Sequence, residues 1–456
     1  MTISENIKKK LLEYQIEHCE NIIRILNKNI TCLDASDTGT GKTYTAIAAC
    51  VELKRIPIII CPKSVISTWK TVCKYFELKD FIVVNYELIK NGKKYNSSQD
   101  KVNAEFLKIQ EDTFVVNIEK DKYIFIFDEV HRCSNLESEN CKLMLAIKKT
   151  GEQMLLLSAT IADFPDKFKP FFYILNFIDP SQVKEMNIDY KKYINIVTKW
   201  IERDYKPMVR IHNMLFPERG SRVRIDVLGD MFPQTQINAL PYTMGKTREI
   251  EIEKEYKKLK LELDQIKDKK NKDKINPLTI TIRAQQKIEI LKIPTFIELT
   301  NDFIYNRFSV VIFVNFTQTL KTLADFLKTD SIVYGEQTME DRMRIIDDFQ
   351  NNKTNIIILN IKAGGIGISL HDIHGGHPRI SLISPPWSSI DLLQALGRIH
   401  RAGGKTKTLQ RIIYTANTIE EKIADKLKIK LGNINSINNG DLDLTNIEFE
   451  NKYNKM

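Results

Sequence analysis

The stretch that decides the fold is Leu33–Ile47, LDASDTGTGKTYTAI, where a short apolar strand runs through a glycine-containing loop into Lys42-Thr43 at the start of a helix. In such an arrangement backbone N–H groups face an anion, the lysine meets the β and γ phosphates, and the hydroxyl reaches Mg²⁺. Gly39 and Gly41 leave room for the close approach of a phosphate. Ser36 stands where the strict GxxxxGKT pattern has its first glycine. The stretch predicts a phosphate-binding loop.

A second stretch, YIFIFDEVHR at Tyr123–Arg132, predicts hydrolysis of the bound nucleotide. Its apolar strand delivers Asp128 and Glu129 at the carboxyl end, where α/β sheets bind ligands. A triphosphatase needs one carboxylate to hold magnesium and commonly another to polarise water. We therefore expect an ATPase with Mg²⁺ held by Thr43 and Asp128, and with Glu129 acting on the water.

The composition is that of an ordinary soluble protein. The chain has 456 residues, 43% hydrophobic and 28% charged, enough for two or three domains. Its formal charge of +10 favours polyanionic partners, although a merely lysine-rich composition gives the same excess. Seven scattered cysteines without a CxxC pair argue against a disulfide framework or zinc ribbon, and for a reducing compartment. Without a signal-peptide layout or a run of roughly 18 apolar residues, we expect a soluble intracellular protein with no membrane contact; nucleus, cytoplasm, viral factory and virion remain open.

Short apolar runs alternate with longer polar segments over residues 30–160 and again over 309–415, which predicts an α/β fold with two doubly wound parallel sheets. An amphipathic helix is expected over residues 7–26 and one long charged helix over 247–274. The expected strands of the first half are 30–34, 56–62, 81–86, 123–129 and 154–160. Those of the second half are 309–316, 331–336, 355–360, 379–385 and 411–415.

The order of motifs resembles the superfamily 2 helicases and translocases, and within them the Swi/Snf-type ATPases. In the first half IIICPKSVISTWK, VVNYEL, DEVHRCSN and LLLSAT look like the segments that contact nucleic acid, hold the DExH carboxylates and couple hydrolysis to movement. In the second half SVVIFVNFTQTL, YGEQTMEDRMRIIDDFQ, IIILNIKAGGIGISL and SPPWSSIDLLQALGRIHRAGGKT follow in the family's order. SRVRIDVLGDMFPQTQINALPYTM and TIEEKIADKLKIK also agree with Swi/Snf-type members. The compact chain is similar to helicases of large DNA viruses.

The resemblance implies two tandem RecA-like lobes with an inter-lobe helical protrusion. The predicted divisions are an ATP-binding lobe with its leading helix and extension at 1–235, the charged protrusion at 236–280, the helicase lobe at 281–432 and a flexible tail at 433–456.

The resemblance also implies catalytic and ATP-binding residues. Arg398 and Arg401 would share one helical face with Gln394 and point at a phosphate held on the other lobe, where a planar guanidinium suits charge spread over phosphoryl oxygens. They join Lys42, Asp128 and Glu129 in the catalytic set. Gln15 would read adenine, or would otherwise be a polar helix residue. The ATP-binding set is Gln15, Asp37, Thr38, Gly39, Thr40, Gly41, Lys42 and Thr43.

Further residues would couple hydrolysis to nucleic acid and contact its backbone. Ser158 and Thr160 would relay closure of the cleft, and His131 would sense hydrolysis. Contacts to phosphates that do not read bases predict low sequence specificity and high salt sensitivity. Trp387 would either pack in the core or face the nucleic acid. The predicted nucleic-acid set is Lys63, Ser64, Trp69, Asn85, Lys362, Gly364 and Gly365.

Two departures keep alternatives open. Ala159-Thr160 replaces the Gly-Thr usual in Swi/Snf-type members, and Gly404 stands where they have glutamine. Translocation on duplex DNA is favoured, with a strand-separating DNA or RNA helicase and a non-catalytic DNA-binding scaffold as the alternatives. A nuclease is disfavoured because no further carboxylate–lysine cluster is visible. Targeting is expected to come from a separate protein partner.

The stretch HDIHGGHPR at His371–Arg379 spaces three histidines by three residues and so imitates a metal site. Its glycines and proline predict instead a hairpin-like connector.

Overall fold

We describe the protein from a computed structural model of the whole chain. The described residues are 2–96, 98, 100–111, 113–178, 189–229, 232–267, 277–364, 368–418, 420–439 and 447–449. The chain divides into two compact units. Unit 1 comprises Met1–Gly229 with Leu431–Leu444, and unit 2 comprises Asp230–Lys430 with Thr445–Met456.

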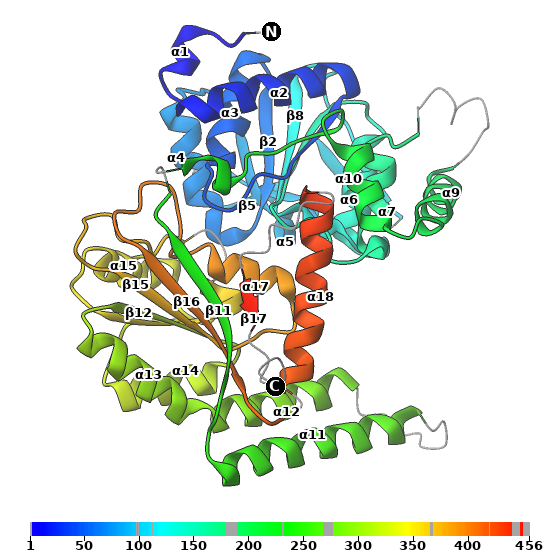
Figure 1. Cartoon of the computed structure of the whole chain (residues 1–456). Coiled ribbons are helices and arrows are strands. Elements are labelled where there is room, and N and C mark those ends of the chain that lie inside the picture. Colours follow the sequence, from blue (N-terminus) through cyan, green and yellow to red (C-terminus); the bar gives the residue numbers. More distant parts are fainter. Residues whose placement is uncertain are drawn as a thin grey trace. The chain divides into compact units, whose positions relative to one another are not determined.

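Unit 1 is built on a six-stranded sheet in the order β10-β1-β9-β8-β2-β3, and every neighbouring pair is parallel (Figure 1). In the register, Asp34 of β1 and Asp128 of β8 both pair with Leu157 of β9. The carboxyl ends of these three strands therefore meet at one edge of the sheet, where α/β folds bind ligands. The strands are β1 Thr31–Asp34, β2 Ile56–Cys61, β3 Ile82–Asn85, β8 Tyr123–Asp128, β9 Gln153–Leu157 and β10 Gly220–Ser221.

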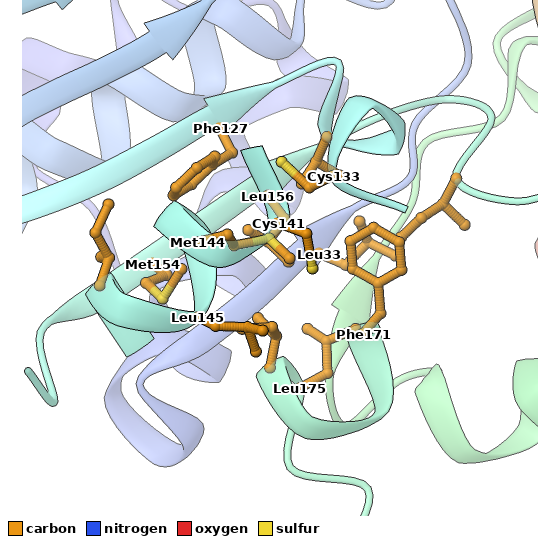
Figure 2. Packing of buried hydrophobic residues seen from close by; sticks show 14 of the residues in the cluster. Leu33, Phe127, Cys133, Cys141, Met144, Leu145, Met154, Leu156, Phe171 and Leu175 are labelled. Atoms are coloured by element: carbon orange, nitrogen blue, oxygen red, sulfur yellow. The ribbon is translucent and has the colours of Figure 1, made fainter. Parts of the chain in front are cut away.

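Helices cover the sheet of unit 1 and bury its apolar runs. Figure 2 shows one face, where strand residues Phe127 and Leu156 meet Met144 of α6 and Phe171 of α7. Two antiparallel hairpins, β4 with β5 and β6 with β7, are inserted between β3 and β8. The helices are α1 Glu5–Lys8, α2 Glu13–Asn29, α3 Lys42–Glu52, α4 Ile66–Tyr75, α5 Tyr86–Ile89, α6 Glu139–Lys148, α7 Pro165–Ile174, α9 Tyr190–Glu202 and α10 Pro207–Leu215, with short 3₁₀ turns η1 Lys63–Val65, η2 Val130–Cys133 and η3 Ile225–Val227. The hairpin strands are β4 Lys93–Tyr95, β5 Lys101–Asn103, β6 Leu107–Gln110 and β7 Thr113–Val116.

All seven cysteines of the chain lie in unit 1 as buried free thiols. Burial raises the pKa of Cys19, Cys73 and Cys141 to about 12 each. Burial also raises the pKa of the remaining four thiols well above its ordinary value. They serve as small core residues.

Unit 2 contains a seven-stranded parallel sheet in the order β13-β14-β12-β15-β16-β11-β17 (Figure 1). Ile252 of α11 and Ile288 of α12 belong to the same buried cluster as Val310 of β12. The strands are β11 Thr235–Tyr242, β12 Ser309–Val314, β13 Ile332–Val333, β14 Ile356–Asn360, β15 Arg379–Ile383, β16 Thr408–Thr415 and β17 Ile447–Phe449. The helices are α11 Lys246–Lys267, α12 Pro277–Leu291, α13 Ile293–Tyr305, α14 Thr317–Leu327, α15 Met339–Gln350, α16 Ile361–Gly364 and α17 Ser389–Leu396. Helix α18, Glu420–Asn439, belongs to unit 2 up to Lys430 and to unit 1 from Leu431.

The predicted α/β class with two parallel sheets is confirmed, and a strand overlaps each of the ten expected ranges. Three details differ. The expected helix over 7–26 is two helices, α1 and α2, with a turn between them. The expected tail from residue 433 is wrong up to Asn439, because Ile434 and Ile437 are buried and continue α18, and again at Ile447–Phe449, which pairs with β11 as β17. The expected helix over 247–274 appears as α11 up to Lys267, and the rest of that range lies outside the described residues.

The two units also divide at a different place from the expected boundary at residue 235. Unit 2 begins at Asp230, and β11 pairs with β16 in its sheet. The expected protrusion at 236–280 therefore contributes a strand and α11 to unit 2.

Candidate active site

The phosphate-binding loop of the sequence analysis joins β1 to α3. Gly39 and Gly41 adopt φ of 89° and 84°, a left-handed backbone that glycine allows at no steric cost. Helix α3 begins at Lys42 and has no acidic residue in its first turn, so the partial positive charge of its N-terminus is not neutralised there. Lys42 Nζ donates to the carbonyl oxygens of Ser36 (2.7 Å) and Asp37 (3.0 Å). The loop is thus shaped for an anion, and its lysine lies over the loop backbone.

Gln15 of α2 lies directly against this loop. Its Nε2 donates to the carbonyl of Thr40 at 3.0 Å, while its Oε1 accepts from the backbone N–H of Leu12 at 3.0 Å. A Cβ added to Gly41 would lie 2.3 Å from Gln15 Nε2, so only glycine leaves room for this contact. The structure places Gln15 beside the nucleotide loop, and adenine recognition by its amide stays a prediction.

A buried histidine that the sequence analysis did not select fastens α2 to the start of the loop. His18 Nε2 lies 3.1 Å from both Asp34 Oδ2 and Ser36 Oγ, and His18 Nδ1 lies 2.9 Å from Ser221 Oγ. Burial raises the pKa of Asp34, but His18, Lys42 and the side chain of Ser36 outweigh it and lower that pKa below its ordinary value. Asp34 is therefore an anion at the base of the loop.

A second segment runs alongside the loop, and the sequence analysis did not predict this position for it. The N–H groups of Leu33, Ala35 and Asp37 each donate at 3.0 Å to a carbonyl of the segment 219–223. The Asp37 carboxylate accepts from Arg222 Nη2 (2.7 Å) and from the N–H of Ile225 (3.0 Å). Because that carboxylate is occupied in this way, contact with ATP by Asp37 is expected from its backbone. The residues of the segment lie about 180 positions along the chain from the loop, so local sequence patterns carry no signal for the pairing.

The other loop residues of the predicted ATP-binding set differ in exposure. Thr40 is buried, and its hydroxyl donates to the carbonyl of Asp37 at 2.8 Å. Thr38 and Thr43 are half-buried. Thr43 is the second residue of α3, the position at which a phosphate-binding loop carries its magnesium-binding hydroxyl, and this role stays a prediction.

Asp128 and Glu129 follow β8 at the same edge of the sheet. Burial and the neighbouring Glu129 carboxylate raise the pKa of Asp128 to about 7. Burial lowers the pKa of Lys42, while the carboxylates of Asp34, Glu129, Asp37 and Asp128 oppose that shift. The loop lysine and both acidic residues are thus brought into one electrostatic cluster, as the motif spacing predicts.

Trp69 is part of this site, which corrects its predicted place on the nucleic-acid surface. Its side chain is 1% exposed, and Nε1 donates to Asp128 Oδ2 at 2.8 Å. The indole face is covered because α4 packs against α3 and β3. Trp69 therefore has no surface to offer to a nucleic-acid strand, and it orients the Asp128 carboxylate.

A short polar chain leads away from Glu129 along the sheet edge. His131 Nδ1 lies 3.3 Å from Glu129 Oε2 and 3.2 Å from Ser158 Oγ, and Ser158 Oγ accepts from the N–H of Thr160 at 3.2 Å. Ser158 and Thr160 are buried at the end of β9. The three predicted coupling residues are therefore connected by contacts to the acidic pair, and their coupling role stays a prediction.

The remaining residues predicted to contact nucleic acid differ in accessibility. Lys63 is exposed and Ser64 half-buried in η1, while Lys362 is exposed in α16. Gly364 ends α16, and Gly365 lies outside the described residues. The predicted contact of Asn85 with nucleic acid is also corrected. Asn85 is 5% exposed, and its amide donates to Glu87 and accepts from the hydroxyl of Tyr95.

In unit 2, Arg398 and Arg401 follow the end of α17 and do not share a helical face, which corrects the prediction. The helix ends at Leu396 with Gly397 as its cap, so Arg398 lies in the turn that follows and Arg401 lies beyond that turn. Arg398 is buried; its Nε donates to the carbonyl of Gln394 at 2.8 Å and its Nη1 to that of Ile368 at 3.1 Å. Burial lowers the pKa of Arg401 to about 10, far enough above neutral pH for it to remain a cation. Gln394 is itself buried.

The arginine loop, residues 397–407, is held by Asp372, which the sequence analysis did not select. The Asp372 carbonyl accepts from the N–H of Lys405 at 2.8 Å, and its Oδ2 accepts from Thr406 Oγ1 at 3.1 Å. The same carboxylate accepts three backbone N–H groups of the connector 374–377. The N–H of Leu370 donates to the carbonyl of Arg398 at 2.9 Å. The connector predicted from HDIHGGHPR is present, and it is organised by a carboxylate.

Within the described residues no group of three or more His, Cys, Asp or Glu side chains could hold a metal ion. In the same part of the chain no helix is long and apolar enough to cross a membrane.

Family models match both units. Residues 8–163 match the family described as type III restriction enzyme, res subunit, and residues 291–403 match the helicase conserved C-terminal domain. The chain belongs to the superfamily 2 helicases, in their Swi/Snf-like branch, and is an ATP-hydrolysing enzyme of that class.

Among known proteins, the chain is similar to "Putative ATP-dependent RNA helicase L364" of Acanthamoeba polyphaga mimivirus, with 39% identity over 97% of this chain and 86% of that protein. It is 24% identical to the human SWI/SNF-related matrix-associated actin-dependent regulator of chromatin subfamily A member 1, over 92% of this chain and 43% of that protein. The chain thus spans less than half of the human relative. Among solved structures, Saccharomyces cerevisiae Dbp5 L327V bound to RNA and ADP BeF3 shares the fold at a TM-score of 0.50, with 13% identity over 98% of this chain and 94% of that one.

Proposed function

We propose that this helicase is a nucleic-acid-stimulated ATPase that translocates on duplex DNA. The observation that carries the proposal is the cluster at the sheet edge of unit 1, where Lys42, Asp128 and Glu129 meet and a polar chain leads on to Ser158. Such a cluster supports hydrolysis together with a path by which the state of the site reaches other parts of the protein. The exposed Lys63 and Lys362 and the formal charge of +10 support a phosphate backbone as the track.

We further propose that the site takes ATP with Mg²⁺. The fit rests on the donor set: two adjacent carboxylates in a buried place raise the pKa of Asp128, and a divalent cation would offset that repulsion. Thr43 and Asp128 would hold the ion, which would supply charge neutralisation between the phosphates. Their oxygens are of the kind that Mg²⁺ prefers.

The chain's own groups then have separate tasks in turnover. Lys42 exchanges its two carbonyl contacts for phosphate oxygens, and Trp69 keeps Asp128 oriented through its indole N–H. Glu129 accepts a proton from the attacking water. Arg401 stabilises charge on the transferred phosphoryl group, and Arg398, through its bonds to the carbonyls of Gln394 and Ile368, holds the loop that carries Arg401. His131 and Ser158 transmit the change in protonation of Glu129 to the end of β9.

One test compares ATP turnover with single-stranded DNA, duplex DNA and RNA, together with triplex-displacement and strand-separation assays. We expect duplex DNA to stimulate ATP turnover, and we expect the protein to displace the third strand of a triplex without separating the strands of the duplex. Glu129→Gln is the matched control: it keeps nucleotide binding and stops turnover. Absence of stimulation by any polynucleotide would refute the motor and favour a non-catalytic scaffold.

A second candidate function is strand separation on RNA or DNA. It is favoured by the printed name of the mimivirus relative, which describes an RNA helicase, and by Ala159-Thr160 in place of Gly-Thr. Unwinding of a tailed duplex at a rate that matches ATP turnover would select it. A separate protein partner is proposed to supply targeting in either case.

A further inference from the structure

Helix α9 of unit 1 carries a cationic stripe that the ATPase site does not use. Lys192, Lys199 and Arg203 are all exposed. Positions seven and eleven residues apart recur on one face of a helix, and at about 1.5 Å per residue the stripe is about 16 Å long. The opposite face holds the helix in place, since Tyr193, Val197 and others are buried in the core of unit 1. The stripe is therefore not required for packing.

Helix stability does not account for Lys192, whereas Lys199 in the last turn of α9 and Arg203 at its C-cap face the negative end of the helix dipole. The first turn of α9 contains Lys191 and Lys192 and no acidic residue, and its N-cap is Asp189, whose side chain accepts the N–H of Lys192. Cations near a helix N-terminus face the positive end of the helix dipole and weaken the helix. An external anion beside Lys192 would add to the compensation that the carboxylate of the N-cap Asp189 supplies.

Exposed aromatic rings lie beside the stripe. Trp200 is 42% exposed, and the guanidinium of Arg210 from α10 lies 3.8 Å from its ring centroid. Tyr205, between α9 and α10, is 89% exposed, with Lys206 Nζ 5.7 Å from its ring centroid. Flat rings next to cations are the platforms on which unpaired bases stack.

We propose that α9 and the connection to α10 form an accessory binding surface for a single-stranded stretch of nucleic acid. The phosphate backbone follows Lys192, Lys199 and Arg203, and the bases stack on Trp200 and Tyr205. A duplex keeps its bases inside and would leave the two rings without a partner, so the aromatic pair selects the single strand. The inference rests on the proposed function only in requiring that the motor acts on nucleic acid.

The test measures fluorescence anisotropy of labelled oligothymidylate and of a duplex of equal length across a range of salt concentrations. The charge variant is K192E/K199E/R203E, and the ring variant is W200L/Y205S. The matched control, K257E/K258E/K260E, makes the same change of charge on exposed positions of α11 in unit 2. Circular dichroism and ATP turnover without nucleic acid are expected to be unchanged in all three.

For the single strand, losing three phosphate contacts makes the negative slope of log affinity against log salt concentration less steep by about 2. The ring variant binds the single strand at least about 5-fold more weakly and the duplex as before. Single-strand binding equal to wild type in either variant, or an equal loss for duplex and single strand in the ring variant, overturns the inference. If the ring variant loses binding to a protein while keeping the single strand, the surface is a protein interface and the inference is wrong. Failure of the wild-type chain to bind any polynucleotide is a different result, because it overturns the proposed function as well.

Discussion

The contact between Trp69 and Asp128 gives the sharpest test of the active site. Trp69→Phe removes the indole N–H and keeps an aromatic ring in the buried position, so the change at Asp128 is the loss of one donor. That donor lowers the pKa of Asp128 against the larger effects of burial and Glu129. We therefore expect the variant to raise this pKa further. Since ionised Asp128 is the form that supports ATP turnover, turnover should rise with pH over a higher pH range in the variant than in the wild type.

The size of the effect follows from the chemistry of the bond. A hydrogen bond to a charged group contributes about 1.5–3 kcal/mol, and one between neutral groups about 0.5–1.5 kcal/mol. With a pKa of about 7 in the nucleotide-free protein, Asp128 is ionised at pH 8.5 and neutral at pH 5.5. The coupling between the two side chains should therefore fall by about half across this range.

A double-mutant cycle isolates that coupling. The free energy of unfolding in urea is measured by circular dichroism for wild type, Trp69→Phe, Asp128→Ala and the double variant, at pH 8.5 and pH 5.5. The cycle removes the change in packing volume that each single substitution brings. Trp387→Phe serves as the control, since Trp387 is 48% exposed.

Two results would refute this reasoning. The first is a coupling at pH 8.5 below about 0.5 kcal/mol, the value of a surface pair. The second is an unchanged dependence of turnover on pH and Mg²⁺ in Trp69→Phe combined with weaker binding of nucleic acid. That pattern would restore the sequence-based prediction that Trp69 contacts the strand.

Three further predictions concern other parts of the site. Arg401→Ala should leave nucleotide binding by unit 1 intact and lower kcat by about 10³, and a lower affinity with normal kcat would reassign the residue. Asp372→Ala should release the arginine loop and lower kcat while fluorescent-nucleotide affinity stays constant; a parallel loss of both would mean general misfolding. Asp128→Asn should stabilise the nucleotide-free protein increasingly as pH rises. The native Asp128 has a raised pKa and holds a proton that the unfolded chain releases between about pH 4 and 7, so wild-type stability falls through this window and levels off above it. A pH-independent difference in urea unfolding would contradict that sign.

The strands of both sheets were predictable because they are buried on both faces and read as unbroken apolar runs. Of the strands that were not predicted, β10 and β11 were missed for physical reasons. β10 is Gly220–Ser221, which is held by backbone pairing to β1 and has no side-chain pattern. β11 mixes Thr235, Gln236 and Asn238 with apolar residues, although it lies between two strands of its sheet.

The site was predictable where chemistry follows a local motif and not where it depends on tertiary contacts. Lys42 and Asp128 are marked by the loop and by the strand end. His18 and Asp372 act through single buried side chains whose partners lie elsewhere in the chain. Trp69 was misplaced because the sequence shows that an aromatic residue is present in the segment but not which way α4 turns it.

Because of the distribution of the cysteines, thiol labelling can follow the opening of unit 1 alone. Every thiol of the chain is buried there and unit 2 contains none, so a thiol reagent added to the folded protein should react only as unit 1 opens. The order in which the seven positions become labelled would rank the local stability of the nucleotide-binding sheet. A cysteine introduced on the surface of unit 2 would react first, and would carry a dye without any native cysteine being removed.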